Sequence, residues 1–285
     1  MKDFDFPALL DEWQVTDKDF AAAYEQTGDV RRSWLKKSIA HTFTLTGGRP
    51  QPASLLQKDW TDGFTARTYS GPCDWVCLCL GADFVSPVQL CAALVPALVA
   101  GVKELVVLRE ENGAPFPASL LTACELSGAE TVCQLPASTL LKLIQTRQDA
   151  GGSGRILALG ALEFSGLRPQ SQDILFWQAP LSLQMGIVFS DDCNWNTSSL
   201  SWAHPGQKFF FWGTPPAGHL LTLQPAATTP ENFRANALFA PAHLLRGQVQ
   251  LGLAPGHELS WYWPELALSF FLDNRMALST RAKQP

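Results

Sequence analysis

Three histidines in the C-terminal third of the chain are the residues best suited to chemistry. His204 ends the run Ser-Trp-Ala-His, His219 ends Pro-Ala-Gly-His, and His257 ends Ala-Pro-Gly-His. An imidazole with a reference pKa of about 6.5 can move a proton near neutral pH, and in its neutral form it can bind a metal ion. Each histidine is therefore a candidate proton-transfer group, metal ligand or substrate contact, and each can equally be an ordinary surface or turn residue.

A cysteine beside two carboxylates is a weaker candidate. Cys193 lies in the run Ser-Asp-Asp-Cys-Asn, where Asp191 and Asp192 would raise the pKa of the thiol and so reduce its reactivity. The two aspartates could form an acid–base pair, but such residues more often begin a loop or cap a helix. The chain has seven cysteines, an odd number that argues against a disulfide framework, so we expect reduced and mostly buried thiols.

Alternating apolar strands and helices must position these groups. The pattern predicts strands at 74–80, 104–108, 131–135 and 155–159, and helices at 85–100, 118–127 and 138–145. Continuous apolar strands separated by helices indicate a parallel sheet covered on both faces. The sequence therefore predicts an α/β protein with a Rossmann-like parallel-sheet domain.

The rest of the chain predicts a second α/β domain. A helix is expected at 17–42, and after Pro169 the sequence becomes rich in aromatic residues and proline, with strands around 186–190 and 208–212. We predict that the Rossmann-like domain spans residues 70–172 and is inserted into a domain built from residues 1–69 and 173–285. The tryptophans of the C-terminal third are expected to fill the core of that second domain.

Composition excludes several classes of protein. The chain has 285 residues, 46% of them hydrophobic and 16% charged, with a net charge of −5 and no basic run. Nucleic acid is therefore an unfavourable partner. No signal peptide or membrane-spanning segment is expected, so we predict a cytoplasmic protein.

Several motifs resemble those of the histidinol dehydrogenase family. The segment Ala93-Leu-Val-Pro-Ala-Leu-Val-Ala-Gly-Val-Lys-Glu-Leu-Val-Val is similar to the family's A-I-P-A-x-V-A-G-V-K-E-I-V. Downstream, Pro216-Ala-Gly-His-Leu-Leu resembles A-P-E-H-L-E, Asn236-Ala-Leu-Phe resembles G-A-I-F, and Ala254-Pro-Gly-His-Glu-Leu resembles G-P-N-H-V-L-P. The order of these motifs is preserved along nearly the whole chain.

The resemblance implies a two-domain histidinol/aldehyde dehydrogenase-like fold. It implies an enzyme that oxidises an amino alcohol through an aldehyde to a carboxylate, with NAD and zinc as cofactors, a small molecule in the interdomain cleft and a homodimeric assembly. By motif position, His219 is the catalytic base, His257 contacts substrate and His204 binds zinc. Gly81 and Thr139 match positions that contact the dinucleotide.

The chain departs from the family pattern at the partners of these residues. Gly218 stands where the family has the carboxylate beside its catalytic histidine, and Gln250 stands where it has a zinc-binding aspartate. In the two turns that hold the dinucleotide, Leu78 replaces a tyrosine and Ala161 replaces an asparagine. A catalytic zinc ion normally needs three protein ligands. The sequence therefore does not identify a cofactor, and NAD and zinc are implied only by the resemblance.

Two functions of different class follow. The first is a non-catalytic homologue of histidinol dehydrogenase, in which degraded cofactor and metal sites leave a scaffold for binding or assembly. The alternative is a divergent NAD-dependent dehydrogenase that oxidises an alcohol or aldehyde. The residues favour the first, because the cofactor turns, the zinc ligands and the catalytic carboxylate are altered together.

Overall fold

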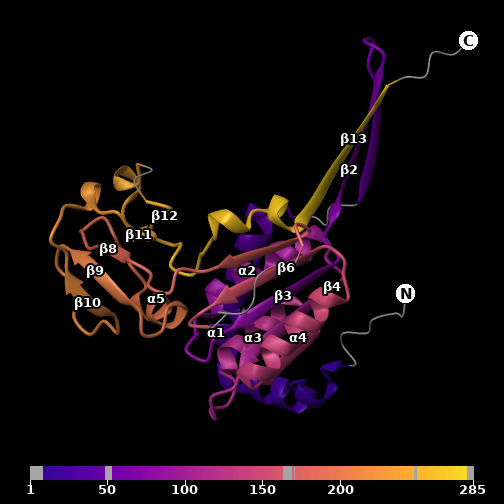
Figure 1. The fold of residues 1–285 in the computed structure, drawn as a ribbon. Coiled ribbons are helices and arrows are strands. Elements are labelled where there is room, and N and C mark those ends of the chain that lie inside the picture. Colours follow the sequence, from indigo (N-terminus) through magenta and orange to yellow (C-terminus); the bar gives the residue numbers. More distant parts are fainter. Residues whose placement is uncertain (1–8, 49–52, 163–168, 170, 247–248, 281–285) are drawn as a thin grey trace, which may run out of the picture.

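A computed structural model describes residues 9–48, 53–162, 169, 171–246 and 249–280 of the chain. It contains two five-stranded parallel sheets and a three-stranded antiparallel sheet that projects from the body of the molecule (Figure 1). The predicted α/β architecture is confirmed, and the second unit is built on a parallel sheet as well. No helix of the described residues has both the length and the apolar character needed to cross a membrane.

The first sheet runs in the order β5-β4-β3-β6-β7, and every neighbouring pair is parallel. Its strands are β3 (Trp75–Leu80), β4 (Glu104–Glu110), β5 (Thr131–Leu135), β6 (Gly154–Leu159) and β7 (Ile174–Gln178), and its helices are α2 (Pro87–Ala100), α3 (Ala118–Ser127) and α4 (Ala137–Asp149). Each strand and helix predicted for this region is present. The sheet also extends beyond residue 172, where we predicted this unit to end, because β7 pairs with β6.

Helix α2 is the centre of the fold. All of its residues except Leu98 are buried, as is every residue of the neighbouring strand β3. The helix begins at Pro87 rather than at the predicted Val85, because the Ser86 hydroxyl accepts a hydrogen bond from Gln89 N and proline fits the first helical position. Gly101, with a φ of +83°, ends it as expected.

Helix α1 (Asp17–Leu45) covers α2 and α3 on one face of the first sheet, whereas α4 packs on the opposite face. A capping box between Thr16 and Asp19 starts it, and Gly28, with φ of +73° and ψ of 159°, bends it. Our predicted division placed residues 1–69 with the C-terminal part of the chain. In the structure, α1 packs against α2 and α3. It also contacts the C-terminal part of the chain, where His41 bonds to Ser260 and Lys37 to Gly256.

The second sheet runs in the order β10-β9-β8-β11-β12, again with every pair parallel. Its strands are β8 (Met185–Val188), β9 (Lys208–Trp212), β10 (Thr222–Pro225), β11 (Ala237–Phe239) and β12 (Leu251–Leu253), and α5 (Thr197–Ala203) lies between β8 and β9. Trp195 packs against Phe239 of β11. Trp261 and Trp263 come from the segment after β12, and one continuous core joins them to α2 and to this sheet.

The antiparallel sheet forms an arm. It consists of β1 (Ser54–Asp59), β2 (Phe64–Pro72) and β13 (Leu272–Thr280), with β2 in the middle. Figure 1 shows β2 and β13 extending together away from both parallel sheets. The arm therefore brings two distant parts of the chain side by side.

A buried arginine anchors the base of this arm on the first sheet. Arg155 of β6 is 2% exposed and donates to the carbonyl oxygen of Leu272 at 3.2 Å and to the carboxylate of Asp273 at 2.8 Å. It also donates to the carbonyl oxygen of Phe270. The first residues of β13 are thus held against β6.

We expect Arg155→Gln to lower the free energy of unfolding by about 3 kcal/mol, because it leaves the half-buried Asp273 carboxylate without its charged partner. Urea unfolding measures the change. Arg275→Gln, on the exposed part of β13, is the control and should change stability by less than about 0.5 kcal/mol. Equal effects of the two substitutions would contradict the anchoring role.

Candidate functional site

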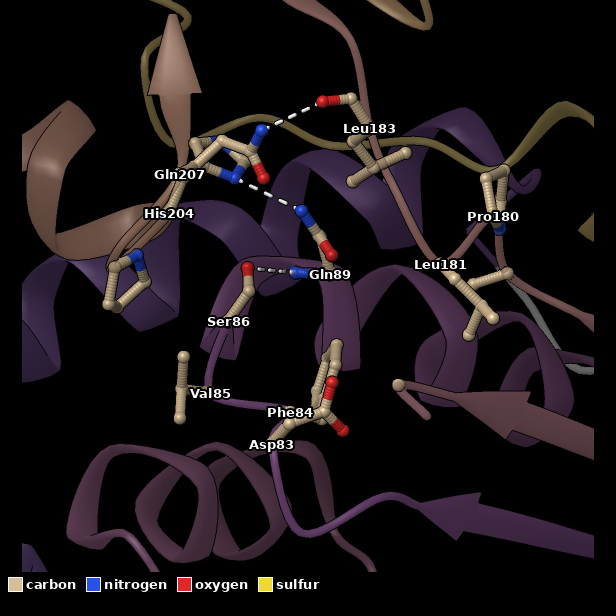
Figure 2. Close-up of a pocket in the computed structure, with 13 residues that line it drawn as sticks. Asp83, Phe84, Val85, Ser86, Gln89, Pro180, Leu181, Leu183, His204 and Gln207 are labelled. Carbon is tan, nitrogen blue, oxygen red and sulfur yellow. Dashed lines mark hydrogen bonds between the residues drawn. The ribbon is translucent and has the colours of Figure 1, made fainter. Parts of the chain in front are cut away.

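The carboxyl ends of β3 and β6 form the natural crevice of the first sheet. The chain leaves β3 toward β4 on one side, and β6 lies on the other, so these ends meet at a topological switch point, where open α/β sheets bind ligands. A cavity of about 130 Å³ lies there (Figure 2). It is lined by Asp83, Phe84, Val85, Ser86, Gln89, Gly160, Ala179, Pro180, Leu181, Leu183, His204, Pro205 and Gln207.

Two glycines let the strand ends approach closely. A Cβ atom at Gly81 would lie 2.6 Å from Asp83 Oδ1 and 2.8 Å from the carbonyl oxygen of Ala161. Gly160, with a φ of +87°, leaves no more room, since its Cβ atom would also lie 2.6 Å from Asp83 Oδ1. Asp83 Oδ1 accepts a hydrogen bond from Ala161 N at 2.8 Å, which ties the two loops together. The two glycines therefore allow the loops after β3 and β6 to contact each other.

Arg109, at the end of β4, holds the loop that follows β3. Its side chain is 2% exposed and donates to the carbonyl oxygens of Ala82 at 2.7 Å and Phe84 at 3.0 Å. Burial lowers the pKa of this guanidinium, and the negative charges of Asp83 and Glu110 oppose that shift. One buried cation thus supplies the donors that this loop needs and holds it in place.

The N-terminus of α2 is also covered. The Ser86 hydroxyl caps Gln89 N and donates to the carbonyl oxygen of Ala203, at the end of α5, at 2.7 Å. Pro87 has no N–H group to offer a ligand. The helix terminus that could attract an anion therefore forms part of the contact between the two parallel-sheet units.

His204 lies on the wall of this cavity, at the C-terminal end of α5. It is 2% exposed, and burial lowers the pKa of its imidazole to about 3. Gln89 Nε2 lies 3.2 Å from Nδ1 (Figure 2), and the ring of Trp261 packs at 5.0 Å between centroids. Nε2 is buried and has no hydrogen-bond partner among the described residues. The residue is thus a neutral imidazole in an aromatic surrounding.

The residues present do not fit the zinc ion that the resemblance implies. Among the described residues, no three histidine, cysteine, aspartate or glutamate side chains are grouped closely enough to hold a metal ion. Gln250, at the position of the absent aspartate, accepts a hydrogen bond from Asn236 at 3.1 Å. His204 alone cannot replace a set of three ligands.

They do not fit a dinucleotide in the crevice either. Sites for ligands of that size usually have volumes of about 300–1,000 Å³, well above the 130 Å³ found here. The carboxylate of Asp83 lines the cavity and would repel a pyrophosphate. Thr139, the other predicted dinucleotide contact, lies in the first turn of α4, beyond β4 and β5, and does not line this cavity.

The three candidate histidines do not meet in one cavity. His257 lines a different cavity of about 540 Å³ beside His41 and Ser260. His219 lies in the connection between β9 and β10, with a buried Nδ1 atom that has no partner among the described residues. It lines neither this cavity nor the crevice. Their predicted roles therefore have no common geometry to support them.

Cys193 lines a third cavity, of about 650 Å³, at the carboxyl ends of β8 and β9, together with Asp191. The six other cysteines are buried, and burial raises the pKa of the Cys73 and Cys91 thiols to about 12. None of the seven cysteines is paired. The expectation that most of the thiols are buried is confirmed.

Several residues of these sites were missed at the level of sequence. Arg109 could have been noticed, since it follows the apolar run Leu-Val-Val-Leu at the end of a strand predicted to be buried. His41 and Ser260 carried no such signal, because 219 positions separate them and neither belongs to a motif. Gln89 was similarly hidden within an apolar helix.

Comparison with known proteins shows what this fold is similar to. No protein-family model matches the chain, and no curated protein sequence does. Among solved structures, histidinol dehydrogenase from Elizabethkingia anophelis matches with a TM-score of 0.58 and 9% identity, over 95% of this chain and 77% of that one. An NAD-dependent benzaldehyde dehydrogenase from Corynebacterium glutamicum matches with a TM-score of 0.49 and 10% identity, over 93% of this chain and 83% of that one. The first match shows that the chain has a dehydrogenase-like fold.

Acid is expected to destabilise the protein through His204. Its pKa in the folded state, about 3, lies below the value of about 6.5 in the unfolded chain, so between these values only the unfolded chain binds the proton. The free energy of unfolding should therefore fall with decreasing pH, by about 2 kcal/mol from this residue between pH 7.5 and pH 5. Urea unfolding at both pH values measures the difference.

His204→Gln removes the titration and keeps a polar partner for Gln89, so the difference between the two pH values should shrink by that amount. His243→Gln, at an exposed position, is the control. An unchanged pH difference in His204→Gln would show that the imidazole is not held neutral.

Proposed function

We propose that this chain is a non-catalytic homologue of the two-domain dehydrogenases and that its scaffold serves binding and assembly. The observation that carries the proposal is the closed crevice at the carboxyl ends of β3 and β6. Arg109 occupies the carbonyl groups of the loop after β3, and Asp83 bridges that loop to the one after β6. Opening the crevice would break the exposed bond between Asp83 and Ala161 together with the more buried bonds of Arg109.

Electrostatics supports the same proposal. A pyrophosphate binds where backbone N–H groups point at it and positive charge or a helix dipole stabilises it. Here the Ala161 N–H is bonded to a carboxylate, the first turn of α2 is capped by Ser86, and the Arg109 guanidinium is directed at carbonyl oxygens. The groups suited to phosphate are already used within the protein.

A reducing compartment, such as the cytoplasm, fits this chain best. All seven cysteines are unpaired, and six of them are buried. Buried free thiols are normal where glutathione and thioredoxin keep cysteines reduced. We therefore propose a cytoplasmic location.

Adding 5 mM NAD is expected to leave the melting temperature unchanged. A site with a dissociation constant of about 50 μM would add about 2.7 kcal/mol at that concentration, which corresponds to about 4–5 °C for a chain of this size. Thermal unfolding monitored by fluorescence measures the shift, and elemental analysis of the purified protein measures zinc.

A clear shift with NAD together with stoichiometric zinc would refute the non-catalytic proposal. The alternative, a divergent NAD-dependent dehydrogenase of alcohols or aldehydes, would then hold, and His219→Ala should abolish turnover. A dehydrogenase of known NAD affinity, measured in the same buffer, is the positive control.

The arm is the part of the scaffold suited to assembly. Among the described residues, the outer edge of β13 has no partner strand, and its Met276 and Leu278 are 68% and 66% exposed. An exposed edge strand of this kind is a template for another strand. We propose that a second copy of the chain covers it, because antiparallel pairing of the same edge about a two-fold axis satisfies both copies at once.

Light scattering after size-exclusion chromatography should give twice the 31.2 kDa of one chain. The double variant Met276→Lys with Leu278→Lys should return a monomer, since two lysines on one face of β13 oppose the same residues of the second copy. Ser279→Lys, on the other face of the strand, is the control and should stay dimeric. A monomeric wild-type protein would overturn the assembly proposal.

A further inference from the structure

A second cavity, far larger than the crevice, lies between the end of α1 and the segment that follows β12. Its volume is about 540 Å³, within the range of about 300–1,000 Å³ that is typical of sites for small organic molecules. It is separate from the two cavities described above, which lie at the carboxyl ends of the two parallel sheets.

One wall carries a hydroxyl group shared by two imidazoles. Ser260 Oγ lies 2.8 Å from Nδ1 of His41 and 3.4 Å from Nδ1 of His257, and the two imidazole centroids are 5.6 Å apart. Ser260 is 8% exposed, His41 is half-buried and His257 is exposed, so this group of polar atoms runs from the protein surface into the cavity wall. Three side chains able to donate hydrogen bonds therefore converge.

The charge around this wall is positive. Lys37, one helical turn before His41, donates to the carbonyl oxygen of Gly256 at 2.8 Å, beside His257. No aspartate or glutamate among the described residues lines the cavity. The nearby Glu258 is 5% exposed, and its Oε1 atom accepts hydrogen bonds from Gly256 N and Asn196 N. Its charge is thus engaged within the loop.

The surroundings of His41 favour its neutral form. Burial lowers the pKa of its imidazole, and the charges of Lys37 and His257 lower it further. An anion placed between the two imidazoles would reverse the effect of those charges and favour the protonated form. Binding of an anion should therefore take up a proton.

Much of the remaining lining is apolar. Leu251 and Leu253 of β12 and the indole of Trp261 line it, together with Leu45 of α1. Leu253 and Trp261 are nearly fully buried, at 6% and 3% exposure. A ligand that fills this cavity would thus meet both apolar surface and hydrogen-bond donors.

We propose that this cavity binds a small carboxylic acid with an apolar body, its carboxylate against His41, Ser260 and His257 and its body against Leu253 and Trp261. This inference rests on the binding role proposed above and names the class of ligand. Its test does not involve NAD, so it can fail while the non-catalytic proposal stands.

The probe is 3-phenylpropionate, compared with the neutral 3-phenylpropanamide of nearly the same shape, by isothermal titration calorimetry. The carboxylate should bind more tightly than the amide by about tenfold or more, because it forms charge-assisted hydrogen bonds. Binding should be tighter at pH 6 than at pH 8, and titrations in two buffers of unequal ionisation enthalpy should reveal proton uptake. No saturable binding of the carboxylate, or equal binding of the amide, would overturn the proposal.

Variants separate the polar wall from the fold. His41→Gln and Ser260→Ala should each weaken 3-phenylpropionate binding by about tenfold, and His41→Gln should remove most of the proton uptake. His257→Gln, at an exposed position, provides a variant that should fold even if the other two do not. His243→Gln, exposed and outside the cavity, is the control and should bind as the wild type does. Unchanged affinity in folded His41→Gln and His257→Gln would refute the site.

Discussion

The buried guanidinium of Arg109 depends on the carbonyl groups of a single loop, which accept hydrogen bonds from its two terminal nitrogens and replace much of the water that it loses. Its Nε atom is buried and has no partner among the described residues. That loop joins a fully buried strand, β3, to an almost fully buried helix, α2, so its carbonyl groups need donors within the protein. The arginine and the loop therefore require each other. Asp83 also accepts a hydrogen bond from Ala161 N, so the loops that follow β3 and β6 are linked at the switch point of the first sheet.

The same region of the molecule connects the two parallel-sheet units. Ser86 bonds to the end of α5, Gln89 bonds to His204, and the indole N–H of Trp263 donates to the carbonyl oxygen of Gln89 at 3.1 Å. All of these contacts come from the first turn of α2. At this point the chain uses polar side chains and an aromatic core to bring the two parallel-sheet units into contact. A site that depended on opening and closing would be costly here.

Open space is found elsewhere on the molecule, where elements from distant parts of the chain meet. The end of α1 and the segment after β12 leave the cavity of His41, Ser260 and His257, and the arm leaves the edge of β13 uncovered. Both features depend on α1 and β13 packing next to segments with which they share no sequence pattern. The proposed binding and assembly roles thus rest on surfaces that surround the sheet core.

The sequence by itself determined the local elements of the first sheet: α3 at Ala118–Ser127 and β5 at Thr131–Leu135 have the predicted bounds, because apolar periodicity and terminal glycines act within a few residues. It also placed β9 at Lys208–Trp212. Only the tertiary structure decided where α1 packs, that β1, β2 and β13 form an arm, and which polar groups share a cavity. His41 and Ser260 are 219 positions apart, and their contact depends on the packing of whole elements, which no local pattern encodes.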